Sequence, residues 1–102
     1  MSSSSVLHRQ LHQAPILAIS GEGSYITLED GRRILDATGG AAVSCLGHSN
    51  EEVKQAMIDQ INRLSYCHTA YFSTKPFEEL ASFLVESTGG KMSRVYIVGS
   101  GI

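Results

Sequence analysis

The last eight residues of the chain, Val95-Tyr-Ile-Val-Gly-Ser-Gly-Ile102, constrain its fold more than any other segment. The apolar run predicts a buried strand, and the glycines after it predict a tight turn whose exposed backbone N–H groups can hold a phosphate. A helix normally follows such a turn and directs its positive N-terminal end at the same anion. Because a single strand cannot satisfy its own backbone groups, we expect partner strands from later sequence and interpret the chain as the front of a larger α/β protein.

The residues before this strand predict a tail or short helix over 1–15 and a partial α/β domain over 16–102. Short strands are expected over 16–20 and 24–28, around a turn at Gly21-Glu-Gly23. Asp30-Gly31 then lies between two apolar runs, which predicts a hairpin whose turn positions both tolerate positive φ and whose returning strand covers 33–36. The tiny residues of 37–44 indicate that another group approaches the backbone closely.

Two amphipathic helices are expected next. Ser49 and Glu52 have the spacing of a capping box, which predicts a helix start at Ser49. Thr74 and Pro76 mark the start of a second helix, and the glycines at 89 and 90 mark its end. The apolar positions recur at helical spacing, which predicts core or a subunit interface: they are Val53, Ala56, Met57, Ile61 and Leu64 in the first helix, and Phe77, Leu80, Ala81, Leu84 and Val85 in the second.

The composition argues against several classes of binding partner. The net charge of −2 gives no electrostatic basis for binding nucleic acid or an anionic membrane, and no apolar run approaches the length of a membrane span. Cys45 and Cys67 fit a reduced intracellular protein, so we expect a cytoplasmic location and leave a mitochondrial one open. Cys45 and His48 have a metal-like spacing, but Cys67 and His68 are adjacent, which disfavours a shared ion, so we expect no metal site. His48 is expected to end a loop and to cap or pack at the start of the following helix.

Taken in order, these motifs resemble the opening of the class III aminotransferases. The resemblance covers about residues 16 to 101 and is carried by Gly23-Ser-Tyr-Ile-Thr-Leu-Glu-Asp-Gly31, Ile34-Leu-Asp36, Gly39-Gly40, Gly47-His48, Gln60, Leu80-Ala81 and Val98-Gly-Ser-Gly101. It implies a homodimeric, pyridoxal-phosphate-dependent enzyme of fold type I. It also implies transfer of an amino group from an amino acid or amine to a 2-oxo acid in the intact protein. The chain would then be an α+β opening segment that enters the large domain at its first strand and phosphate turn.

The resemblance also implies site residues. Ser100 and Gly101 would lie at the phosphate of pyridoxal 5'-phosphate, where Gly101 offers its N–H and a side chain would collide. Ile102 stands where the family has a hydroxyl residue, so this contact is weakened. Ala41 and Ala42 would line the substrate pocket, where the family often has larger aromatic residues, and their small size would leave room for a bulky or branched substrate. Asn50 stands where the family usually has proline.

No catalytic residue is predicted in this chain. The chemistry needs a lysine that forms a Schiff base with the cofactor and a carboxylate against the pyridine nitrogen. In the family both lie far downstream of the glycine turn. The lysines here are Lys54, Lys75 and Lys91, and none is at the position of the Schiff-base lysine. We therefore expect the isolated chain to be an inactive fragment that binds the cofactor weakly or not at all.

Two other interpretations stay open at this stage. The chain could be a non-catalytic, truncated partner that pairs with full-length aminotransferase subunits through its exposed strand edge and helix faces. Alternatively, Val95 to Ile102 could open a dinucleotide-binding domain, since a strand followed by G-x-G also begins that fingerprint. The second interpretation leaves the first ninety or so residues unexplained.

Overall fold

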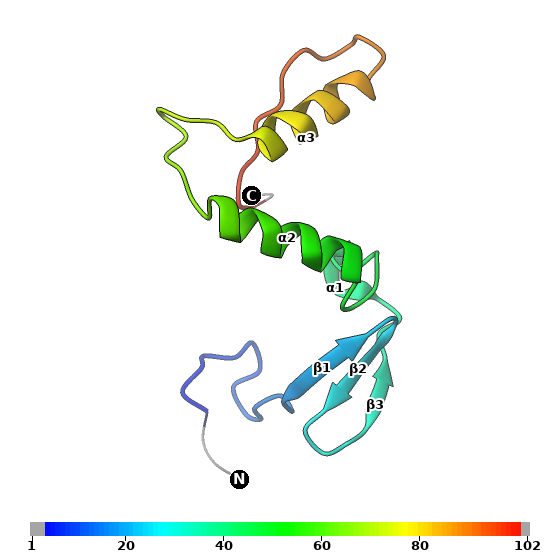
Figure 1. Cartoon of the computed structure of the whole chain (residues 1–102). Helices are drawn as coiled ribbons and strands as arrows, with labels where there is room; N and C mark the ends of the chain where they lie inside the picture. The colour runs from blue at the N-terminus through cyan, green and yellow to red at the C-terminus, as the bar shows by residue number, and fades with distance from the viewer. Residues whose placement is uncertain (1–3, 101–102) are drawn as a thin grey trace. The chain divides into compact units, whose positions relative to one another are not determined.

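The computed structural model describes residues 4–100 of the chain. The chain divides into two compact units, residues 1–59 and residues 60–102. Three strands are followed by three helical segments, in the order β1-β2-β3-α1-α2-α3 (Figure 1). Residues 4–15 form neither helix nor strand, so this part of the predicted tail does not contain the short helix. Within the described residues, no helix is long and apolar enough to span a membrane.

The first unit contains an antiparallel sheet of β1 (Ala18–Glu22), β2 (Tyr25–Leu28) and β3 (Arg33–Leu35), with β2 in the middle. All three predicted strands form, but β1 begins and ends two residues later than the predicted 16–20, and the first turn is displaced with it. Glu22 pairs with Tyr25, so the turn consists of residues 23 and 24, and Gly21 lies inside β1 opposite Ile26. The expected turn at 21–23 was therefore wrong by about two residues, since both glycines resemble turn residues in the sequence.

The second hairpin forms where Asp30-Gly31 predicts it, with a different turn. Gly31 has a φ of 90°, whereas Asp30 does not have a positive φ. Leu28 N–H donates to the Arg32 carbonyl at 2.8 Å, and Gly31 N–H donates to the Leu28 carbonyl at 2.9 Å. This is a three-residue loop with one left-handed position, the glycine. The predicted hairpin is confirmed, and of the two positions that tolerate a positive φ, Gly31 adopts one.

The helical segments are α1 (Gly39–Ala42), α2 (Glu51–Arg63) and α3 (Lys75–Glu86). The capping box predicted at Ser49 is not formed. Asn50 instead caps α2, because its side-chain oxygen accepts the Val53 N–H at 3.0 Å. The start of α3 agrees with prediction: Thr74 is the N-cap residue and a proline occupies the first turn.

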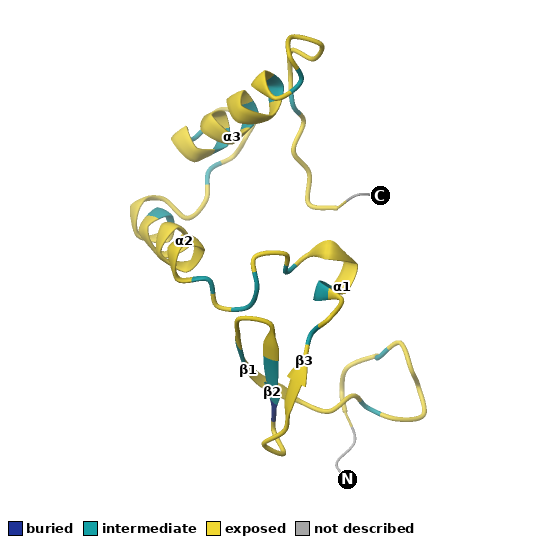
Figure 2. Ribbon diagram, turned by 90° about the vertical axis from the view of Figure 1, so that its right-hand side faces the viewer, coloured by how far each residue is buried: buried dark blue, intermediate teal, exposed yellow. Residues whose placement is uncertain are grey.

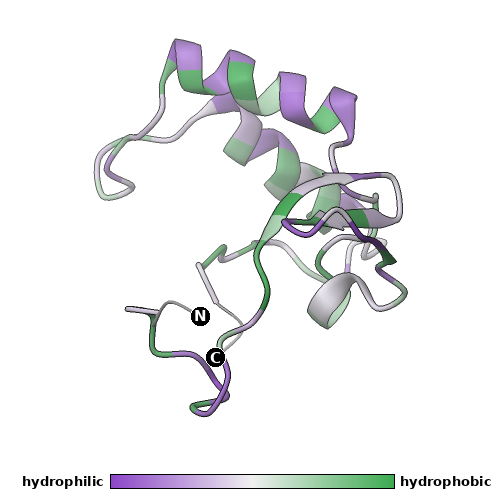
Figure 3. Ribbon diagram, turned by 90° about the horizontal axis from the view of Figure 1, so that it is seen from below, coloured by the Kyte–Doolittle hydropathy of each residue, from purple (hydrophilic) through white to green (hydrophobic). Residues whose placement is uncertain are grey.

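The described residues contain almost no core. Among residues 4–100, Leu28 is the one buried apolar residue, with 8% of its surface exposed (Figure 2). Green and purple segments alternate along the helices, as expected for amphipathic helices (Figure 3). Their apolar residues are nevertheless exposed, for example Ile61 at 60% and Phe83 at 69%, while Phe77, Ala81 and Val85 are half-buried. The stripes were predicted correctly as helical, but the described residues do not bury them in a core, and their prediction as a subunit interface is not tested.

The predicted strand over residues 95–98 does not form. Residues 92–98 have no regular secondary structure, and Tyr96 is 91% exposed. The physical reason is that a strand requires a hydrogen-bonded neighbour, and the three described strands pair only with one another. The apolar run remains in the sequence without a sheet to join.

Candidate functional site

The strongest polar cluster in the described residues is centred on Asp36, directly after β3. Its Oδ2 atom lies 2.7 Å from Nε2 of His48. Its Oδ1 atom accepts the backbone N–H of Gly39 at 2.9 Å. The hydroxyl groups of Thr38 and Ser44 donate to the same carboxylate at 3.4 Å each. One carboxylate thus connects the end of the sheet to both ends of the segment that follows.

This arrangement favours an ionised Asp36. The hydrogen bond with His48 lowers the pKa of Asp36 below its ordinary value, and the backbone N–H of Gly39 contributes in the same direction. An ionised carboxylate can only accept hydrogen bonds, so Nε2 of His48 carries the proton that lies between them. The side chains of Asp36 and His48 are 15% and 25% exposed, which makes this pair well shielded compared with the other ion pairs described.

The segment 37–48, here called the bend, carries the predicted substrate residues Ala41 and Ala42. Both are exposed. The bend includes α1, but Gly40 and Ala41 have non-helical backbone angles, so it is a folded loop rather than a regular helix. Ala42 has a φ of 59°, an unfavourable conformation for a residue with a Cβ. Such a conformation persists only where surrounding contacts hold it.

The predicted phosphate turn is only partly described. Ser100 is exposed, Gly101 lies outside the described residues, and a Cβ added at Gly99 would contact nothing within 4 Å. Residues 96–100 are all exposed. The described part of this turn therefore does not by itself enclose a phosphate group. It also lies in the second unit, whereas Ala41 and Ala42 belong to the first.

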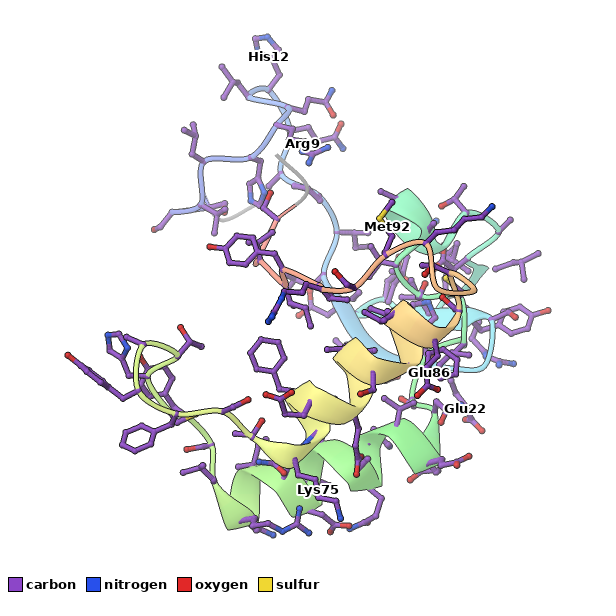
Figure 4. All side chains as sticks on the ribbon, turned by 90° about the horizontal axis from the view of Figure 1, so that it is seen from above. Arg9, His12, Glu22, Lys75, Glu86 and Met92 are labelled. Carbon is purple, nitrogen blue, oxygen red and sulfur yellow. The ribbon has the colours of Figure 1, made fainter. Side chains whose placement is uncertain are left out.

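The lysines are surface residues. Lys54 pairs with Glu51 at 2.8 Å, and Lys75 lies 3.8 Å from Glu79 near the start of α3 (Figure 4). Lys91 is exposed after the end of α3. Glu86, labelled in the same view, marks the other end of this helix. These three side chains are solvated, and none lies in a buried pocket of the kind that activates a Schiff-base lysine.

The cysteine–histidine spacing does not gather metal ligands. Cys45 is exposed and its thiol donates to the Ala42 carbonyl at 2.9 Å, while His48 bonds to Asp36. Within residues 4–100, no group of three histidine, cysteine or acidic side chains is placed to hold a metal ion.

Sequence reasoning missed the Asp36–His48 pair. It assigned Asp36 to a strand and placed His48 beside the next helix, where Asn50 in fact provides the cap. The one residue in the sequence that could have indicated this pair was Gly21. A Cβ at this position would lie 2.8 Å from Cβ of His48, so a glycine inside a strand marks the approach of the histidine.

Comparisons with known proteins match nearly the whole chain. The family model for aminotransferase class-III matches residues 6–102. An uncharacterised aminotransferase of Schizosaccharomyces pombe is 47% identical over 90 residues, which are 88% of this chain and 19% of the relative. An acetylornithine aminotransferase of Mycolicibacterium smegmatis is 39% identical over 87 residues, 85% of this chain and 22% of that enzyme. A succinylornithine transaminase of Salmonella paratyphi A is 33% identical over 88 residues, with 86% and 21% covered. The chain thus spans about a fifth of the length of these relatives.

Proposed function

The chain belongs to the class-III aminotransferases, and from that premise we propose that it is the N-terminal segment of a pyridoxal-phosphate-dependent enzyme. The intact enzyme would transfer an amino group from an amino acid or amine to a 2-oxo acid. The observation that carries the proposal is the extent of the family match, which covers both the bend and the glycine turn in one ordered alignment over residues 6–102.

The role proposed for this chain is binding rather than bond-making. Pyridoxal phosphate supplies the electron sink that amino-group transfer requires. Ser100 and Gly101 would contact its phosphate, and Ala41 and Ala42 would face the substrate. The exposed turn and the solvated lysines do not form a cofactor site alone, so the Schiff-base lysine and the rest of the phosphate site would come from the remainder of the enzyme.

The substrate class is proposed from the bend and the relatives. Acetylornithine and succinylornithine aminotransferases are among the similar proteins, so acylated diamino acids are the first donors to test. Two alanines at 41 and 42 add little bulk, which favours a donor with a long or branched side chain. The acceptor would be tested in the same assays with a panel of 2-oxo acids.

We also propose a fold type I homodimer located in the cytoplasm, with a mitochondrial location to be tested by cell fractionation. The exposed apolar residues of α2 and α3 support burial in the intact protein, because a monomeric domain rarely leaves such faces uncovered. The family match does not favour the truncated-partner or dinucleotide interpretations.

The test compares two proteins. The first is the native product, captured from its source with an antibody against residues 51–65, and the second is the purified 102-residue chain. With pyridoxal phosphate and a donor panel, the native product is expected to form the new amino acid, and the purified chain is not. A native product that transfers no amino group from any donor would contradict the proposed function. Transfer by the purified chain would contradict the assignment of catalysis to later sequence.

A further inference from the structure

The bend is attached to the sheet at its two ends by the same pair of side chains. Asp36 precedes the bend and His48 closes it, and their side-chain atoms are 2.7 Å apart. The loop between them gains little from packing, because α1 contains non-helical angles and contributes no buried residue. The pair therefore closes the base of the bend in the way a cross-link closes a loop.

A second set of contacts fixes His48 itself. Its backbone N–H donates to the Gly23 carbonyl at 2.7 Å, and its carbonyl accepts the Gly23 N–H at 3.0 Å. These two bonds extend the sheet by one isolated bridge at the turn between β1 and β2. The adjacent Ser49 hydroxyl donates to the Gly21 carbonyl at 2.5 Å. The histidine is thus held from both its backbone and its ring.

The close approach depends on glycine at two positions. Gly21 leaves room for the His48 side chain, and a Cβ at Gly47 would lie 2.9 Å from the Gly23 carbonyl oxygen. Gly47 also has a φ of 82°. The sequence thus provides space on both sides of the contact. The contacts of His48 with Asp36, Gly21 and Gly23, here called the junction, are therefore a specific feature of the fold rather than a chance surface pair.

We propose that Asp36 and His48 are positioning residues that hold Ala41 and Ala42 in place for the substrate. This inference rests on the proposed function and deepens it. The pair lies at the base of the bend and acts through its backbone. Its loss should raise KM for the amino donor and leave kcat largely unchanged, which is the pattern for a group that aids binding and chemistry equally.

The first test measures the junction without any catalysis. Hydrogen exchange of the 37–48 segment is followed in the full-length product of the natural gene, with His48→Ala, Asp36→Ala, the double variant and His48→Gln. His48→Ala should accelerate exchange by roughly tenfold. Asp36→Ala should accelerate it at least as much, because it also removes the acceptor of Gly39, Thr38 and Ser44. The double variant should add little to Asp36→Ala, because the hydrogen bond to His48 is already lost there. Glutamine keeps an N–H donor at a similar reach, so His48→Gln should remain within about threefold of the natural protein. His12→Ala, an exposed histidine in the N-terminal segment, is the matched control.

The second test measures donor kinetics with the same proteins. His48→Ala should raise KM by roughly five- to tenfold with kcat within about twofold, and His48→Gln should restore most of the loss. Equal impairment of both variants, additive exchange effects or an unchanged KM would overturn the proposal. A natural product with the slow exchange but no amino transfer would refute the proposed function alone, whereas full activity with unaltered exchange in His48→Ala would refute the positioning role alone.

Discussion

The Asp36 carboxylate lies 2.7 Å from Nε2 of His48, although twelve positions separate the two residues in the chain. This hydrogen bond connects the end of β3 to the end of the bend, and the family match covers both residues. The geometry gives a physical reason for a Leu-Asp and a Gly-His motif at this separation. The first motif supplies an acceptor at the end of a strand, and the second supplies a donor on a backbone that a glycine allows to approach.

The junction should weaken in acid. The pKa of Asp36 in the folded protein is lowered from an ordinary value of 3.8, so the unfolded chain binds the proton more readily. The stabilisation from the ionised carboxylate is therefore complete above about pH 3.8 and is lost as the pH falls through the lower, folded-state value. Hydrogen exchange of 37–48, corrected for the intrinsic pH effect, should accelerate only as the pH falls below about 3.8. If exchange in Asp36→Asn accelerated by the same amount over the same pH change, protonation of Asp36 would not be the cause.

A methyl group at position 21 should displace His48. Because a Cβ there would lie 2.8 Å from Cβ of His48, Gly21→Ala should destabilise the junction by about 1–3 kcal/mol, the usual cost of overpacking. Gly99→Ala is the matched control, since its Cβ would meet nothing within 4 Å, and its effect should stay within about 1 kcal/mol. Exchange of the His48 and Gly23 amides measures both. Equal effects of the two variants would show that the close approach is not the cause.

Glycine should have opposite effects at the two adjacent alanines. Ala42 has a φ of 59°, so Ala42→Gly relieves left-handed strain and should stabilise the bend by up to about 1 kcal/mol. Ala41 has a φ of −83°, so Ala41→Gly removes no such strain and should cost about 0.5–1 kcal/mol through chain entropy. Exchange rates of 37–48 in the two variants provide the comparison. The same sign for both would contradict the strained conformation at position 42.

Bulk at position 41 should narrow the donor range. In the intact enzyme, Ala41→Phe is expected to lower kcat/KM for an acylated diamino acid by about tenfold or more, and to change it about threefold or less for alanine as donor. The small donor serves as the internal control for folding. A uniform decrease for all donors would place Ala41 outside the substrate pocket.

An acidic residue on the exposed face of α2 should have opposite effects on the isolated chain and on the intact enzyme. Ile61 is 60% exposed here, so Ile61→Glu should reduce aggregation of the purified 102-residue chain. In the intact enzyme, where this face is proposed to be covered, the same change should cost several kcal/mol and lower the yield of folded protein. Light scattering and soluble yield measure the two effects. Unchanged yield of the intact enzyme would indicate that the face stays in solvent.

The local elements could be predicted because their causes are local. Asp30-Gly31 specifies a hairpin, and Pro76 with the downstream glycines sets the limits of α3. The helix stripes follow from the spacing of their apolar residues. Turn type and cap identity were less accessible, because Gly21 and Gly23 are equivalent in sequence, and Ser49 and Asn50 are both good cap residues.

The remaining features depend on partners that local sequence does not reveal. The pairing of Asp36 with His48 requires the chain to return to the sheet, and only the glycine inside β1 indicates this return. Residues 95–98 have the composition of a strand but no neighbouring strand among the described residues, so propensity alone gave the wrong state. The same explanation covers the exposed faces of α2 and α3, since amphipathicity predicts a partner without supplying it.

The most direct test of the central claim is the intact mass of the native product captured with the antibody against residues 51–65. The claim that these residues work as the first part of a complete aminotransferase predicts a polypeptide about five times the 11.0 kDa mass of this chain, in keeping with the length of its relatives. A native product with a mass near 11.0 kDa would contradict that claim.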